Sequence, residues 1–111
     1  MKPSDQYLKI VEWSDEDGCY VGTCPSLFEG GVHGSDEAAV YKKLVSVVEE
    51  WIDIHKNDGL PLPEGTANKK FSGKFVVRLN PEVHKMLYIQ SLKRGVSLNA
   101  LCSDILKKSA T

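Results

Sequence analysis

The chain has 111 residues, of which 41% are hydrophobic, so it is long enough for one ordinary domain or two very small ones and too apolar for wholesale disorder. Its formal charge of −1 conceals a split: residues 1–66 carry a net charge of −8 and residues 67–111 a net charge of +7. The basic part suits a polyanion, above all nucleic acid, whereas the acidic part suits a cationic partner.

Several classes of protein are excluded by simple counts. No apolar run approaches the roughly 20 residues that cross a bilayer, and no signal-peptide core follows Met1, so we expect a soluble, cytoplasmic protein without membrane contact. Three cysteines are too few for a disulfide framework, and the five-residue step from Cys19 to Cys24 places them on opposite strand faces. Cys102 is expected as a buried thiol on a helix. The histidines lack partners at metal-ligand spacing, so we expect neither a metal site nor a cofactor.

The chain opens with a predicted hairpin. Residues 7–13 are rich in β-branched and aromatic side chains, which indicates a strand, and residues 14–18 supply turn chemistry that ends in Gly18. Residues 19–23 form the returning strand. A third short strand is expected around residues 29–32, where Gly30-Gly31 suggests a bulge.

A long helix follows. Ser35 is the expected cap, and acidic residues fill the first turn, where they favour the positive end of the helix dipole. The apolar residues recur at three- and four-residue spacing and predict one buried face: Val40, Leu44, Val47, Val48 and Trp51. Tyr41 and Trp51 are expected in the core. Gly59 and Pro61 end the helix.

The stiff segment 60–65 is expected to add an edge strand before the composition turns basic. We therefore place a domain boundary at residue 66. Residues 1–66 predict a small α+β domain with the order β-β-β-α-β, and residues 67–111 a second domain.

The second domain reads as strand, helix, turn and helix. Residues 71–79 alternate, with Phe75, Val77 and Leu79 on one face. Asn80 caps a helix that starts at Pro81, runs to about residue 94 and is closed by Gly95. Ser97 caps a second helix, whose apolar stripe is Leu98, Leu101, Cys102, Ile105 and Leu106.

This short unit cannot bury a sufficient core alone, and its single strand has no partner. Both problems disappear in a homodimer in which two chains pair their strands above four helices. The outer face of the paired strands then presents Lys74, Val76 and Arg78 twice, and a two-stranded ribbon fits the DNA major groove. Ser97 and Asn99, at the start of the second helix, are expected to contact phosphate.

Residues 71–108 resemble the ribbon-helix-helix repressors. The matching pieces are Phe75-Val76-Val77-Arg78-Leu79, then Asn80-Pro81-Glu82-Val83-His84, then the run from Gly95 to Leu101. Val76 is apolar where the family commonly has a polar residue, so the resemblance does not fix its base contact; an apolar side chain there can contact a thymine methyl group. Two other interpretations remain open: a helical hairpin that stabilises some other oligomer, and a helix-turn-helix that reads DNA through the Ser97 helix.

The first domain shows no catalytic constellation. The carboxylates of Glu12 and residues 15–17 lie at a hairpin turn without the spacing of a calcium loop, and no phosphate-binding glycine loop is present. We therefore expect no catalytic residues and no enzyme activity.

The whole chain resembles the HicB antitoxin family. The resemblance rests on Asp17-Gly18-Cys19-Tyr20-Val21-Gly22, on Gly30-Gly31-Val32-His33-Gly34 before Ser35-Asp36-Glu37-Ala38, on the Trp51 helix, on Leu62-Pro63-Glu64-Gly65 and on the attached ribbon-helix-helix. It implies a degraded ribonuclease-H-like first domain that masks a small basic toxin, a HicA-like RNA-cleaving enzyme of a type II toxin-antitoxin system. It implies also a second domain that dimerises and represses the operon by binding operator DNA. Which residues contact the toxin does not follow from the sequence.

Two further functions fit the same residues. One is a ribbon-helix-helix repressor whose first domain senses a ligand or partner other than a toxin. The other is an enzyme with an appended DNA tether, which a pocket of convergent carboxylates with perturbed pKa values would favour.

Overall fold

The computed structural model describes residues 1–111 and divides the chain into two compact units. Unit 1 is Met1–Ser72 and unit 2 is Gly73–Thr111, so this division falls a few residues beyond the expected boundary at residue 66. None of the helices is both long enough and apolar enough to pass through a membrane.

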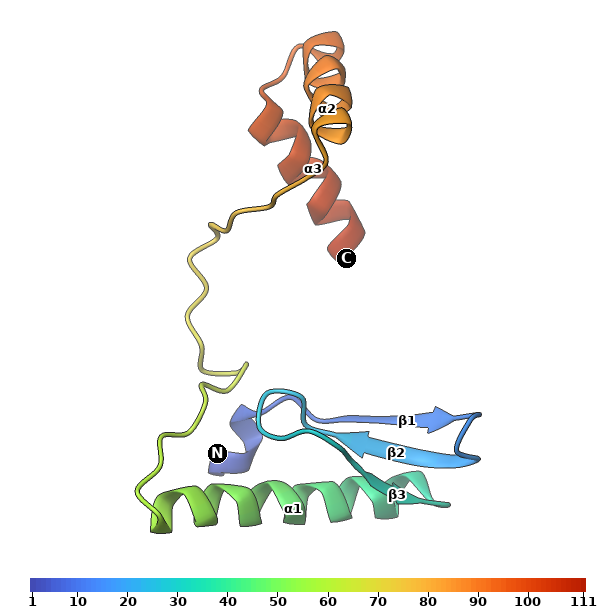
Figure 1. The fold of residues 1–111 in the computed structure, drawn as a ribbon, viewed down its shortest axis with the longest axis vertical. Coiled ribbons are helices and arrows are strands. Elements are labelled where there is room, and N and C mark those ends of the chain that lie inside the picture. Colours follow the sequence, from blue (N-terminus) through green and yellow to red (C-terminus); the bar gives the residue numbers. More distant parts are fainter. The chain divides into compact units, whose positions relative to one another are not determined.

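Unit 1 packs one helix on a three-stranded sheet (Figure 1). Its elements are the 3-10 helix η1 (Pro3–Gln6), the strands β1 (Ile10–Ser14), β2 (Cys19–Thr23) and β3 (Val32–Gly34), and the helix α1 (Glu37–Asn57). The strands are antiparallel in the order β1-β2-β3, with Trp13 opposite Tyr20 and Val21 opposite His33. The α+β class and the first four elements of the predicted order are confirmed.

Three boundaries differ from expectation, each for a local reason. The first strand starts at Ile10 rather than at Tyr7. The 3-10 helix η1 ends at Gln6, and the Tyr7 side chain that follows it is buried in the core. The third strand lies at Val32–Gly34, after Gly30 turns the chain with a φ of 83°. The helix cap is Asp36 rather than Ser35, since the Asp36 carboxylate accepts a hydrogen bond from the Ala39 amide at 2.9 Å.

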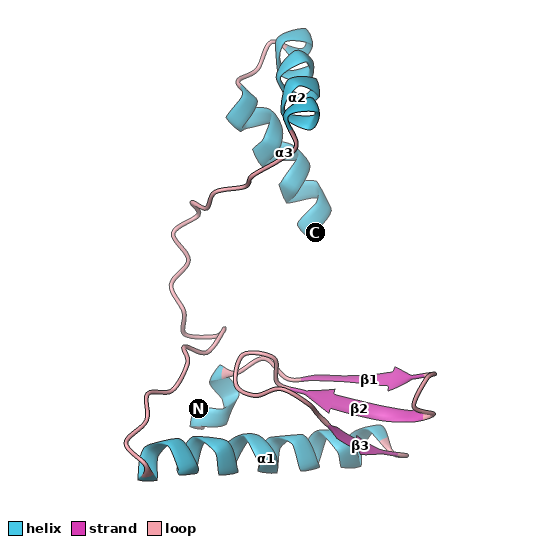
Figure 2. Ribbon diagram, in the orientation of Figure 1, coloured by secondary structure: helices cyan, strands magenta, loops and turns pink.

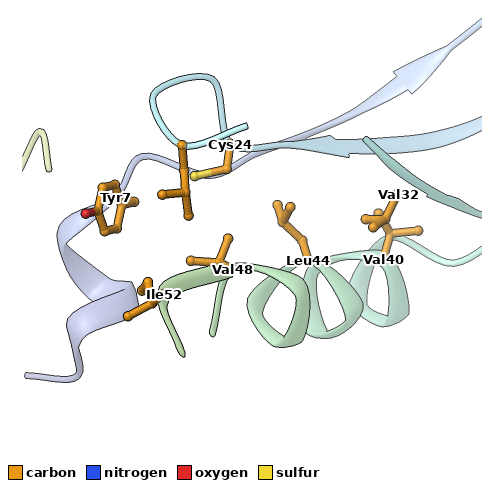
Figure 3. Close-up of a cluster of buried hydrophobic side chains, with 8 residues drawn as sticks. Tyr7, Cys24, Val32, Val40, Leu44, Val48 and Ile52 are labelled. Carbon is orange, nitrogen blue, oxygen red and sulfur yellow. The ribbon is translucent and has the colours of Figure 1, made fainter. Parts of the chain in front are cut away.

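The core of unit 1 lies between α1 and the sheet (Figure 3). Four helix residues spaced four apart are buried: Val40, Leu44, Val48 and Ile52. They pack with side chains from η1's end, β3 and the loop after β2: Tyr7, Cys24, Leu27 and Val32. The helix lies so close to the sheet that a Cβ atom on Gly22 would be 3.1 Å from the side chains of both Val32 and Val40.

Two aromatic residues expected in this core are not in it. Tyr41 is 49% exposed and Trp51 is 39% exposed. Trp51 lies beside the apolar stripe, where its ring stacks on Phe28 with the ring centres 5.6 Å apart. The fourth buried position of the stripe is taken by Ile52 instead, which continues the four-residue spacing.

The predicted edge strand over residues 60–65 is wrong (Figure 2). Pro61 and Pro63 have no amide hydrogen to donate to a ladder, and this segment contacts the rest of unit 1 in other ways. Leu62 packs against the core, and the Tyr7 hydroxyl donates to the Pro63 carbonyl at 2.7 Å. The predicted β-β-β-α-β order therefore lacks its last strand.

Unit 2 contains two helices, α2 (Pro81–Arg94) and α3 (Leu98–Ala110). They pack against each other, and each has one buried side chain: Ser91 of α2 is 2% exposed and Leu101 of α3 is 1% exposed. Their predicted order and boundaries are confirmed.

Candidate nucleic-acid interface

The caps of unit 2 fix where each helix begins. The Asn80 side chain accepts a hydrogen bond from the Glu82 amide at 2.8 Å, with Pro81 in the first turn. Gly95 ends α2 with a φ of 68°, a left-handed conformation that glycine adopts without a side-chain clash. The Ser97 hydroxyl then accepts from the Ala100 amide at 3.0 Å. These three predicted caps are confirmed.

The segment before α2 is not a strand in the single chain. Residues 71–79 carry no strand, although their sequence alternates as a strand does (Figure 2). A strand exists through backbone hydrogen bonds to a neighbouring strand, and unit 2 contains no other segment of that kind. The expected strand is therefore absent from the isolated chain, and its formation by pairing with a second chain stays a prediction.

Beside this segment lies an apolar groove of about 240 Å³. It is lined by the segment, by α2 and by α3, through Val77, Leu79, Val83, Leu87, Cys102, Ile105 and Leu106. Val77 and Leu79 line the groove, whereas Val76 is 82% exposed and Arg78 lies outside the groove. The alternation in the sequence thus corresponds to two environments at residues 76–79.

The groove leaves the core of unit 2 incomplete. Leu101 is its one buried apolar side chain, while Val83 is 42%, Ile105 38% and Leu106 49% exposed. Cys102, expected as a buried thiol, is only half-buried because it lines the open groove. A contiguous apolar surface of this kind favours association with another protein surface.

The five predicted DNA contacts all lie on the surface of unit 2. They are Lys74, Val76, Arg78, Ser97 and Asn99. Lys74 and Asn99 line a shared hollow of about 690 Å³ together with Phe75, which was expected on the inner face of the segment. Arg78 makes no ion pair within the chain, so its guanidinium group remains available to an external acceptor.

One basic residue at this hollow was missed as a candidate contact. Lys107 lines it beside Lys74, as does Ser103. The spacing of Asn99, Ser103 and Lys107, four residues apart on α3, could have identified Lys107, because residues at that spacing share one face of a helix.

Other cations of unit 2 are engaged by Asp104. Its carboxylate lies 3.1 Å from the Lys108 ammonium and 3.7 Å from the Arg94 guanidinium. The hydrogen bond and charge of Lys108, followed by the charge of Arg94, hold the pKa of the Asp104 carboxyl below its usual range. Asp104 therefore stays ionised and offsets part of the positive charge at the far ends of α2 and α3.

Comparison with known proteins gives one family match. Residues 62–106 match the model of the HicB family, a stretch that begins within the segment 60–65 and includes the alternating segment 71–79, α2 and most of α3. No curated protein and no solved structure matches the chain. The match covers 45 of the 111 residues, so it shows a likeness to the HicB family over that stretch of the chain.

Proposed function

We propose that the chain is an antitoxin that also represses its own operon. In this proposal unit 1 binds and masks a small basic RNA-cleaving toxin of the HicA-like kind and has no catalytic role of its own. Unit 2 pairs with a second copy as a ribbon-helix-helix dimer and binds operator DNA. The proposal rests above all on the family match, because it falls on the part of the chain that carries the predicted ribbon.

The groove of unit 2 supports a homodimer. In a two-fold arrangement, the Val77 and Leu79 side chains of both copies would cover the exposed parts of Val83, Ile105 and Leu106. Pairing of the two segments would also satisfy backbone groups that have no strand partner in one chain. One association would thus complete both the core and the sheet.

The same pairing would turn the opposite residues outward for DNA. Arg78 is suited to bidentate contact with guanine, and Val76 to the methyl group of thymine. Ser97 and Asn99 would fix the position of the dimer on the phosphate backbone. Lys74 and Lys107 would add attraction for DNA that weakens with salt.

The charge of the first 66 residues, a net of −8, supports the toxin-binding role. Complementary charge speeds the encounter of two proteins and excludes wrong partners, while buried contacts set the lifetime of the complex. A cationic ribonuclease fits that surface, whereas nucleic acid is repelled by it.

The test is co-expression of the full chain with the product of the neighbouring reading frame. We expect a small basic protein to co-purify, its RNA cleavage to stop at saturating chain, and the chain to protect a DNA fragment upstream of the two genes. Undiminished RNA cleavage at saturating chain contradicts the antitoxin role, and absence of upstream DNA binding contradicts the repressor role.

A further inference from the structure

The indole ring of Trp13 is held rigidly at the end of β1 while half of it faces water. Trp13 is 51% exposed, and its ring meets that of Tyr20 edge to face with the centres 5.2 Å apart. The indole N–H donates a hydrogen bond of 2.7 Å to a carboxylate oxygen of Asp15. An exposed but fixed tryptophan loses little entropy on binding, and residues of this type are common energetic centres of protein interfaces.

The surroundings of this ring are strongly acidic. Residues 10–41, which include all three strands, contain seven acidic side chains and no lysine or arginine. Three of the seven form the exposed turn at residues 15–17, next to Trp13. The Asp17 carboxylate is positioned by the Ser14 hydroxyl, which donates to it at 3.1 Å. Negative charge therefore gathers around the aromatic pair.

We propose that Trp13, Tyr20 and the carboxylates of residues 15–17 form the docking surface for a cationic protein. An arginine or lysine of that partner lies over the Trp13 indole and beside the Asp15 carboxylate. The ring attracts the cation through its negative face, and the carboxylate adds a charge-assisted hydrogen bond. The inference rests on the proposed toxin-binding role of unit 1 and names the surface that performs it.

Charge disfavours two other occupants of this surface. Nucleic acid and a second copy of the same acidic surface are both repelled by it, because like charges facing each other across an interface are costly. A basic protein gains from the same field at long range, before any contact forms.

Trp51 provides a matched comparison within unit 1. It is 39% exposed and also has an aromatic neighbour, Phe28. Its helix, however, carries three lysines among its acidic residues, so the charge around it is mixed. A comparison of the two tryptophans therefore shows whether binding of a cation requires only an exposed ring, as at Trp51, or also an acidic setting, as at Trp13.

The first experiment titrates the full chain with an acetylated hexa-arginine peptide and follows both indole N–H signals by NMR. We expect the Trp13 signal to shift and the Trp51 signal to stay. The double substitution Asp15→Asn and Asp17→Asn keeps the shape of the turn and should weaken peptide binding about fivefold.

The matched control, Glu49→Gln with Asp53→Asn, removes the same charge from α1, where both residues line a hollow that also holds Lys2 and Lys56. It should change peptide binding by less than about twofold. Equal weakening by the two double variants, or an unmoved Trp13 signal, overturns the inference.

The second experiment uses the toxin itself. Trp13→Ala, checked for folding by circular dichroism, should bind the toxin about tenfold more weakly, whereas Trp51→Ala should bind it as the wild type does. If Trp13→Ala neutralises the toxin as well as the wild type, the docking surface is wrong and the antitoxin role stands. If the wild type itself does not neutralise the toxin, the antitoxin role fails, and the peptide titration still decides whether this surface binds cations.

Discussion

The hydroxyl of Tyr7 donates a 2.7 Å hydrogen bond to the carbonyl of Pro63, which joins the beginning of unit 1 to the segment after α1. Tyr7 is 5% exposed and belongs to the core, so this bond is partly shielded from water. The contact holds the segment 60–65 against the core of unit 1 without any strand pairing.

Tyr7→Phe should lower the free energy of unfolding of unit 1 by about 1 kcal/mol, because it removes the hydrogen bond and keeps the ring. Urea unfolding followed by tryptophan fluorescence measures this change selectively, since both tryptophans of the chain lie in unit 1. A variant as stable as the wild type contradicts the role given to the Tyr7–Pro63 bond.

The buried thiol of Cys24 predicts a loss of stability in alkali. Burial raises the pKa of Cys24 above its ordinary value near 9, although the charge of Lys9 opposes part of the shift. The unfolded chain therefore loses this proton at lower pH than the folded chain does. The contribution of the protonated Cys24 thiol to the free energy of unfolding is fully present below the ordinary pKa. It is lost as the pH rises through the raised pKa of the folded chain.

We expect the unfolding midpoint of unit 1 to fall above about pH 9, by a greater amount in the wild type than in Cys24→Ala. The control Cys19→Ala keeps the buried thiol and should retain the alkaline loss. If the unfolding midpoint of Cys24→Ala falls as much as that of the wild type, the effect belongs to other groups. Tyr7 is one of them, because burial also raises its pKa.

Substitutions at two neighbouring positions test the dimer. Val77 lines the groove and Val76 does not. Val77→Asp should therefore place a charge at the pairing surface and split the dimer. Val76→Asp adds the same charge outside the groove and should leave the dimer intact. Sedimentation of each full-length variant at micromolar concentration measures the outcome. A folded wild-type monomer at that concentration rules out the proposed dimer.

Arg78→Ala tests how DNA is read. It should cost roughly 1–3 kcal/mol for each contact with guanine and relax the preference at one position of each half-site. Lys93→Ala removes the same charge from the last turn of α2 and should leave the preference unchanged. Binding selection with randomised DNA gives both profiles. The helix-turn-helix alternative predicts instead that Arg78→Ala is silent and that changes at Asn99 or Ser103 alter the preference.

Local chemistry made some elements of the fold predictable. Asn80, Gly95 and Ser97 act on backbone groups within a few residues of themselves, so their types alone indicate where α2 and α3 begin and end. The four-residue spacing of Val40, Leu44 and Val48 likewise indicated the buried face of α1.

Other elements depend on neighbours that a sequence does not name. The alternation at residues 71–79 is real, but a strand there requires a second strand that one chain lacks. The edge strand at residues 60–65 failed because its two prolines cannot donate to a ladder. Trp51 was placed in the core because helical periodicity gives the direction of a side chain but not how far the opposing sheet extends over it.

The predicted contacts for DNA show the same limit. The alternation separated Val77 from Val76 and Arg78, and of these three residues Val77 alone lines the groove. The four-residue spacing from Asn99 indicates the face of α3 on which Lys107 lies, but its place beside the distant Lys74 depends on how α3 packs, and both lysines line one hollow.

The incomplete core of unit 2 has a consequence for gene dosage. Unit 1 encloses its own core within one chain, whereas the stability of unit 2 would depend on protomer abundance if a second copy completes its core, as proposed. If unit 1 masks a toxin and unit 2 binds an operator as a dimer, as proposed, scarce copies would still mask the toxin one to one, while operator occupancy would fall roughly with the square of the supply. A cell that runs short of this protein would therefore reopen its promoter before it loses protection.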